Sequence, residues 1–140
     1  MIKRFIPLLF TFTMLSSSMT NAMTGDSVAA EFRGEWIPAK ASCNSSLKTV
    51  IEANKVSFIN GSQTASYPKL EQCFSCMGHD VNNITLLSTD AMGDSPFTIY
   101  LDSSKKIPAI QVAFDNDKKL GTRFPFGKSS LKKCPSTSLK

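Results

Sequence analysis

The sequence predicts an all-β protein, a small antiparallel barrel or sandwich in which one segment can form a short helix. Three observations predict this fold. Several short runs alternate apolar and polar residues, an Asn-Gly pair separates two of these runs, and turn-forming residues recur between the others at regular spacing. Alternation with a period of two places the apolar side chains on one face of a strand. Many short strands separated by turns are typical of antiparallel barrels and sandwiches.

The strongest local prediction is a hairpin around Asn60-Gly61. Residues 55–59 lead into this pair, and residues 62–67 follow it with a second run of strand character. Asn-Gly tolerates positive φ angles at both central positions of a turn, which is what a type I′ turn needs. We therefore expect two strands joined by a type I′ turn at Asn60-Gly61.

Further strands are expected at residues 84–89, 97–102, 107–115 and 120–126. In the second of these, Phe97, Ile99 and Leu101 share one face. The polar residues 115–119 form the turn before the last strand. Residues 45–54 fit either a strand or a short helix, because their apolar residues also suit a period of 3.6.

The N-terminus has the three-part layout of a secretory signal peptide. A basic start precedes an apolar run from Phe5 to Leu15, and small residues surround a cleavage site after Ala22. The run is shorter than the about 20 residues that a bilayer-spanning helix needs. We expect a periplasmic or secreted protein that loses residues 1–22, keeps no transmembrane segment and forms one β domain over residues 23–140.

Positive charge is concentrated toward the C-terminus. From Ser103 to Lys140 there are nine basic and two acidic residues, whereas from Met23 to Asp102 there are five basic and nine acidic residues. Such a region suits an acidic protein, a polyanion or an anionic envelope surface, or it is a solvated lysine fringe that keeps the protein soluble. The basic residues are interspersed and the protein is expected to be exported, so nucleic acid is not expected as a partner.

All four cysteines lie in the part that is expected to be exported: Cys43, Cys73, Cys76 and Cys134. An even number in an exported chain predicts two disulfide bonds, for which three pairings exist. We expect Cys73 and Cys76 to staple their segment to distant parts of the chain, one bonding to Cys43 and the other to Cys134. Each bond would close a long loop and contribute about 3–4 kcal/mol.

Residues 73–80, with the sequence CFSCMGHD, also have cysteine spacing seen in metal and redox sites. A zinc site would use Cys73, Cys76 and His79 with one more cysteine. A thiol-exchange site would need Cys73 at the N-terminus of a helix. The glycine and asparagines that follow argue against a helix there. An oxidising compartment favours disulfides over thiolates, so neither a metal nor a cofactor is expected, and thiol or metal binding stays an alternative.

His79 is the only histidine, and with Asp80 it follows the cysteine pair. A disulfide-braced loop that carries a histidine is similar to the inhibitory loop of periplasmic lysozyme inhibitors, although here the histidine lies outside the cysteine pair. The resemblance implies that His79 and Asp80 form a binding loop that enters the cleft of another protein, and bracing would lower the entropy cost of binding. Alternatively His79 is an exposed side chain, or a copper ligand with Met77 and Met92.

Gly34, Glu35 and Trp36 begin the first expected strand. A Gly-x-Trp there resembles the opening motif of lipocalin-like barrels, in which the tryptophan closes one end of the barrel. The resemblance implies structural roles for Gly34 and Trp36, and for a late arginine, Arg123, stacked over Trp36 in a cation–π pair. In the alternative interpretation, Trp36 is simply a large core aromatic residue.

An enzyme is not expected, because the sequence has no Gly-x-Ser-x-Gly turn and no phosphate-binding glycine loop. We expect a protein-binding module, an inhibitor or immunity-type protein that acts on an envelope or incoming enzyme through the loops around His79 and the basic C-terminal region. A lipocalin-like carrier of a small apolar ligand is the first alternative, although ten phenylalanines would fill its interior. A periplasmic thiol- or metal-binding protein that uses Cys73-x-x-Cys76 is the second.

Overall fold

A computed structural model of the chain describes residues 27–73, 83–88, 94–104 and 106–136. Within these ranges the elements are η1 (Ala30–Phe32), β1 (Gly34–Pro38), β2 (Leu47–Ile51), β3 (Val56–Asn60), β4 (Gln63–Tyr67), β5 (Leu70–Cys73), β6 (Asn83–Ser88), β7 (Thr98–Asp102), β8 (Ala109–Ala113), α1 (Lys118–Arg123) and β9 (Leu131–Lys133). The predicted signal peptide lies outside the described residues. Neither of the two helical segments in these ranges is long and apolar enough to cross a membrane.

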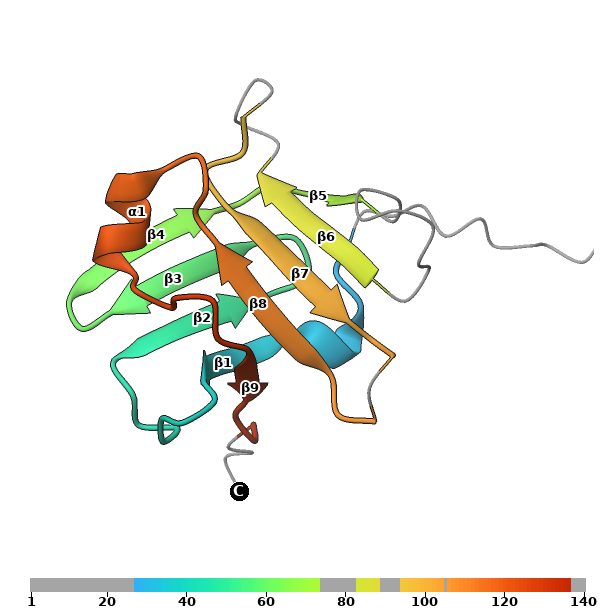
Figure 1. The fold of residues 1–140 in the computed structure, drawn as a ribbon. Coiled ribbons are helices and arrows are strands. Elements are labelled where there is room, and N and C mark those ends of the chain that lie inside the picture. The colour runs from blue at the N-terminus through green and yellow to red at the C-terminus, as the bar shows by residue number, and fades with distance from the viewer. Residues whose placement is uncertain (1–26, 74–82, 89–93, 105, 137–140) are drawn as a thin grey trace, which may run out of the picture.

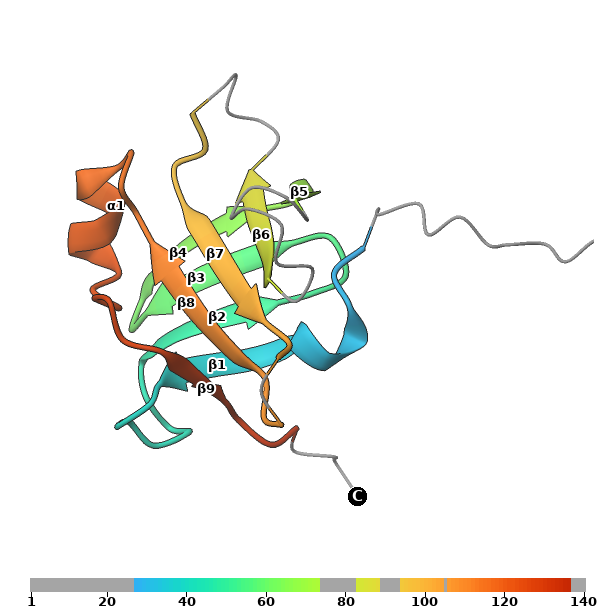
Figure 2. The same ribbon diagram turned by 45° about the vertical axis from the view of Figure 1, so that its right-hand side comes forward.

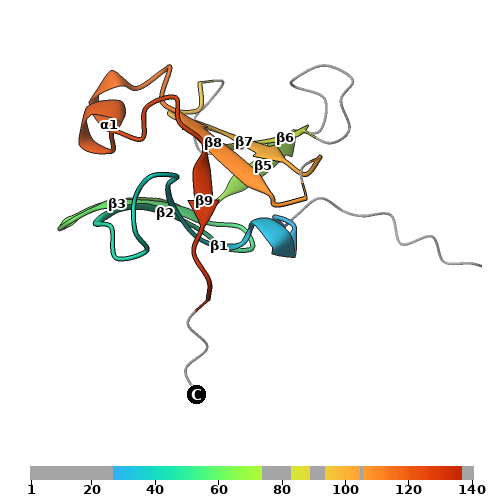
Figure 3. The same ribbon diagram turned by 60° about the horizontal axis from the view of Figure 1, so that its bottom comes forward.

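The strands form one antiparallel sheet in the order β4-β3-β2-β1-β9-β8-β7-β6-β5. The sheet curls into a nearly closed barrel (Figure 1), whose two edges, β4 and β5, follow each other in sequence with only Pro68 and Lys69 between them. Figure 3 shows β1, β2 and β3 in one layer and β6, β7 and β8 in the other. The prediction of an antiparallel all-β barrel is confirmed.

The three residues of β9 join the two halves of the sheet. β1 to β4 are neighbours in chain order, and so are β5 to β8. On one side of β9, Lys133 lies opposite Trp36 and Leu131 opposite Pro38, and on the other side Leu131 lies opposite Ile110. Without β9, both β1 and β8 would present unpaired backbone groups along an edge. The closure of the barrel therefore depends on the C-terminal end of the chain.

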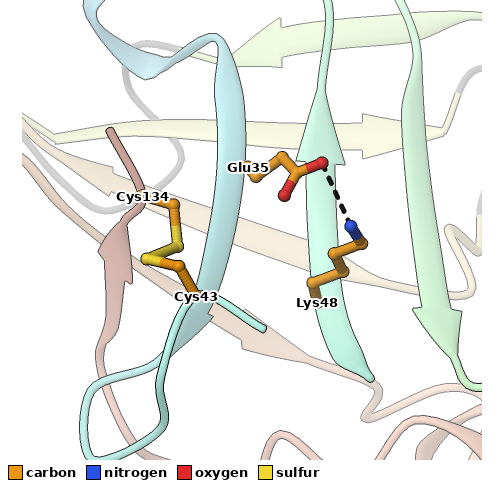
Figure 4. The surroundings of a disulfide bond; sticks show 4 residues. All are labelled: Glu35, Cys43, Lys48 and Cys134. Atoms are coloured by element: carbon orange, nitrogen blue, oxygen red, sulfur yellow. Dashed lines mark hydrogen bonds and ion pairs between the residues drawn. A yellow bond between two sulfur atoms is a disulfide. The ribbon is translucent and has the colours of Figure 1, made fainter. Parts of the chain in front are cut away.

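A disulfide bond between Cys43 and Cys134 holds β9 in this place (Figure 4). It connects the loop after β1 to the residue after β9, across a sequence separation of 91 residues. The N–H of Cys134 also donates a hydrogen bond to the carbonyl of Glu35 at 2.8 Å. The disulfide bond is therefore part of the same junction as the β1–β9 pairing.

The expected disulfide pairing is wrong, because Cys43 and Cys134 bond to each other. β9 pairs with β1, which brings Cys134 beside the β1–β2 loop, whereas Cys73 ends β5 at the far edge of the sheet. Cys73 is disulfide-bonded as well. Its partner is neither Cys43 nor Cys134, and Cys76 lies outside the described residues.

Aromatic side chains fill the barrel interior around Phe58. Its ring centroid lies 5.0 to 6.1 Å from those of five other rings: Tyr67, Phe97, Phe114, Phe124 and Phe126. The predicted inward face of the strand that contains Phe97 is confirmed, since Phe97, Ile99 and Leu101 are all buried. Trp36, Phe32 and Val28 belong to the same buried cluster.

The hairpin formed by β3 and β4 is confirmed, but its turn type is wrong. Asn60 pairs with Gln63, so the two loop residues are Gly61 and Ser62. Of these, Gly61 has a positive φ of 59° and Ser62 does not. Glycine at the first central position alone is the pattern of a type II′ turn, which joins strands of the same twist equally well.

The strand expected at residues 120–126 is also wrong, because these residues begin inside α1. Asp117 caps the helix, and its side chain accepts a hydrogen bond from the N–H of Leu120 at 2.9 Å. Leu120 and Phe124 are both buried, and a separation of four residues fits a strand and a helix equally. Residues 45–54, for which the sequence allowed a strand or a short helix, contain the strand β2. This strand pairs with β1 on one side and β3 on the other.

Loss of the disulfide should destabilise the barrel strongly. We expect Cys43→Ser combined with Cys134→Ser to lower the free energy of unfolding by about 3–5 kcal/mol, because the closed loop is long. Urea denaturation followed by Trp36 fluorescence measures the change. The double variant with added reductant is the control, since it separates this bond from the bond of Cys73. A loss below about 1 kcal/mol would contradict a role of the bond in holding β9.

We expect the titration of Tyr67 to lower the free energy of unfolding at alkaline pH. Burial raises the pKa of its hydroxyl above the ordinary value of 10.0, Asp117 raises it further and Arg123 lowers it. The folded state thus favours the protonated phenol. The resulting contribution of Tyr67 to the free energy of unfolding is fully present below pH 10.0, and it is lost as the pH rises through the folded-state pKa.

We expect Tyr67→Phe to reduce the loss of stability above pH 10.0 relative to the wild type. Urea unfolding of both proteins at neutral and alkaline pH measures the difference. Tyr100→Phe, which removes the other tyrosine hydroxyl, is the matched control. An equal effect of the two substitutions would refute the assignment to Tyr67.

Candidate functional site

A surface cleft of about 530 Å³ lies where η1, the start of β1 and the residues after β9 meet. Its lining consists of Ala30, Arg33, Gly34, Glu35, Lys133, Cys134, Pro135 and Ser136. The antiparallel pairing of β9 with β1 brings these two distant parts of the chain together. We call this site the β1–β9 cleft.

Lys133 reaches from β9 over Trp36 to η1 at this cleft. Its ammonium lies 5.9 Å from the centre of the Trp36 ring and donates a hydrogen bond to the carbonyl of Glu31 at 2.8 Å. Gly34 has a φ of 128°, and a Cβ atom there would lie 3.0 Å from Cε of Lys133. Gly34 therefore provides both the backbone conformation and the space that the lysine stem needs.

Trp36 is fully buried below Lys133. Its indole N–H donates a hydrogen bond to the carbonyl of Phe32 at 2.8 Å, so η1 is tied to the barrel core. Phe32 is itself completely buried. The tryptophan thus satisfies its one polar group while it packs as a core aromatic residue.

The expected stacking of Arg123 over Trp36 is wrong. Arg123 ends α1, where its guanidinium lies 5.1 Å from the centre of the Phe124 ring and reaches Gln63 and the carbonyl of Thr64. Figure 2 shows α1 and η1 on different sides of the barrel. The cation over Trp36 is Lys133, its neighbour across β1 and β9. The sequence indicated this residue only through its position beside Cys134.

Positive charge exceeds negative charge in the lining of the cleft. Arg33 donates from Nε to the carbonyl of Val28 at 2.7 Å and from Nη2 to Oγ of Ser27 at 3.3 Å. Glu35, the acidic residue of the lining, forms an ion pair with Lys48 at 3.1 Å (Figure 4). In the part of the chain that the structure describes, no carboxylate lies within ion-pair distance of Arg33 or Lys133. The cleft therefore carries a net positive charge.

The basic C-terminal region is divided by the fold. Lys118, Lys119 and Arg123 lie on α1, beside the β3–β4 turn, where Asn60 donates to the carbonyl of Arg123. Lys133 lies at the opposite end of strands β1 to β4, because the register places Gly34 and Asn60 at opposite ends. The charge that the sequence groups together thus forms separate surfaces.

A second hollow, of about 410 Å³, lies between β8 and the segment around α1. Tyr100, Gln111, Phe114 and Lys128 contribute to its lining. Gln111 donates a hydrogen bond to the carbonyl of Lys128 at 2.9 Å, which fixes the segment after α1 against β8. The charged residues of its lining are Asp115 and Lys128, which carry opposite charges.

The structure brings Gly34, Trp36, Cys43 and Cys134 of the predicted site residues together at the β1–β9 junction. The predicted binding loop of His79 and Asp80 lies outside the described residues. Cys43, Cys73 and Cys134 are all disulfide-bonded, so in this oxidised form they offer no thiolate for zinc. Within the described ranges, no three His, Cys, Asp or Glu residues are grouped as a metal site.

Comparisons with protein-family models, curated proteins and solved structures find no significant match to this chain.

Substitution of Gly34 tests the packing of the cleft. We expect Gly34→Ala to lower the free energy of unfolding by about 2–3 kcal/mol, because it adds backbone strain and crowds Lys133. Gly127→Ala is the matched control, since Gly127 also has a positive φ but open space around it. It should cost about 1 kcal/mol. Equal losses in urea denaturation would show that contact with Lys133 is not important.

Proposed function

We propose that the protein is an exported protein-binding module, an inhibitor or immunity-type protein that acts on an envelope enzyme or on an enzyme that enters the envelope. The observation that carries the proposal is the filled barrel interior. Phe58 and the five rings around it occupy the space where a lipocalin-like carrier would hold its ligand. A filled barrel has its outer surface available for binding.

The rigidity of the β1–β9 cleft supports binding to a protein. The Cys43–Cys134 bond holds one wall, and the hydrogen bond from Trp36 to Phe32 holds η1 on the other. A surface that is already ordered loses little conformational entropy when a partner docks. Such preorganisation is common among inhibitors, whose interfaces move little on binding.

Export is supported by the disulfide bonds. Cys43, Cys73 and Cys134 are all oxidised, and disulfides persist in the periplasm and outside the cell rather than in the cytosol. The predicted signal peptide of residues 1–22 agrees with such a compartment. The enzyme partner is therefore sought among periplasmic, wall-degrading and secreted enzymes.

A binding and inhibition assay tests this proposal. The oxidised protein is mixed with a panel of purified wall-degrading and periplasmic enzymes, and complex formation is measured beside residual enzyme activity. We expect one enzyme to form a stoichiometric complex and to lose its activity. Arg33→Glu should weaken the complex at least about tenfold, since it reverses one of the positive charges that line the cleft. Lys118→Glu, the same charge change on α1, is the matched control and should have little effect.

The proposal fails if no enzyme of this panel binds, and the carrier hypothesis replaces it if native mass spectrometry of the purified protein finds bound apolar molecules. The two outcomes are distinguishable because extraction with organic solvent would release only a carried ligand.

A second candidate function is thiol–disulfide chemistry at Cys73. The observation that favours it is that Cys73 is disulfide-bonded, while Cys43 and Cys134 are bonded to each other. Peptide mapping without reductant identifies the partner of Cys73. A bond within the Cys73-x-x-Cys76 pair, reduced readily by glutathione, would favour this function, whereas a bond that resists glutathione would favour a structural staple.

A further inference from the structure

We infer that the β1–β9 cleft holds the carboxylate of an acidic side chain of the bound protein between Arg33 and Lys133. The inference rests on the proposed function and names the chemical group that this site recognises. The basis is a pair of cations that line the same cleft and whose hydrogen-bond partners among the described residues are all uncharged.

Both cations keep hydrogen-bond donors for a ligand. The guanidinium of Arg33 has five N–H groups, of which the carbonyl of Val28 and the hydroxyl of Ser27 use two. The ammonium of Lys133 has three, of which the carbonyl of Glu31 uses one. The remaining donors suit an oxyanion, and a guanidinium fork matches the two oxygens of a carboxylate.

The charge of the lining favours an anionic group. Arg33 and Lys133 are not neutralised by any described carboxylate, while Glu35 is paired with Lys48. Two cations of the lining therefore stay available to attract an anionic group. The neutral residues Ala30, Gly34 and Pro135 complete the walls, which suits the stem of an acidic side chain.

The cleft is also large enough and stiff enough for this task. Its volume of about 530 Å³ lies within the range of about 300–1,000 Å³ that is typical of small-ligand sites. The stem of Lys133 packs against Gly34 and over Trp36, and Nε of Arg33 is held by Val28. Little side-chain freedom is therefore left to lose when a carboxylate binds.

The first test is an NMR titration of the oxidised, isotope-labelled protein with a short oligoglutamate peptide. We expect saturable shifts of the amide signals of Gly34, Glu35 and Cys134. Added salt should weaken the binding, because it screens the charges. An oligoglutamine peptide of the same length should produce none, and inorganic phosphate should bind more weakly than oligoglutamate. Absence of saturable shifts at these residues, or tighter binding of phosphate, would overturn the inference.

Substitutions locate the binding at the two cations. Arg33→Gln and Lys133→Gln should each weaken oligoglutamate binding about three- to tenfold. Arg33→Lys should also weaken it, because lysine keeps the charge but loses the planar fork. Lys132→Gln is the matched control, since Lys132 is exposed on the same strand but does not line the cleft. An equal effect of Lys132→Gln would show non-specific attraction and refute the site.

The design also separates this inference from the proposed function. Lys133→Gln is compared only after its spectrum shows a folded barrel, and Arg33→Gln tests the site independently of the Trp36 packing. If an enzyme complex forms and Arg33→Gln leaves it unchanged, the carboxylate site is refuted and the protein-binding proposal survives. If oligoglutamate binds as expected but no enzyme of the panel does, the site stands and the proposed function fails.

Discussion

The pairing of β9 with β1 and β8 is the interaction on which the rest of the structure depends. A strand of only three residues joins two four-stranded halves, with Leu131 paired on both sides. Three residues form few ladder hydrogen bonds, so a short strand at a chain end would fray readily. The Cys43–Cys134 bond compensates for this weakness, because it limits how far the end of β9 can move from β1.

The candidate site is a consequence of the same junction. The register that places Lys133 opposite Trp36 also places it against Gly34 and below η1. One cation thus lies over the buried Trp36 ring and lines the β1–β9 cleft with Arg33. Stability and the proposed binding site are linked at this end, whereas at the other end Arg123 connects α1 to the β3–β4 turn.

Local sequence patterns predicted the secondary structure best where the predicted strand pairs with neighbouring strands in the sheet. Phe97, Ile99 and Leu101 are buried as their alternation indicates, and the hairpin around Gly61 follows from its turn residues. The pattern failed around Leu120 and Phe124, because a separation of four residues satisfies both a strand and a helix. There the cap of Asp117, a local hydrogen bond, selected the helix.

The sequence by itself determined the antiparallel all-β class, most of the strands and the presence of disulfide bonds, since these follow from alternation, turn residues and an even cysteine count. Only the tertiary structure decided which cysteine meets Cys43 and which cation covers Trp36. Both depend on β9 lying beside β1, a contact between the two ends of the folded chain. Local residue patterns carry no information about such a contact, because it is set by the spatial order of all the strands in the sheet.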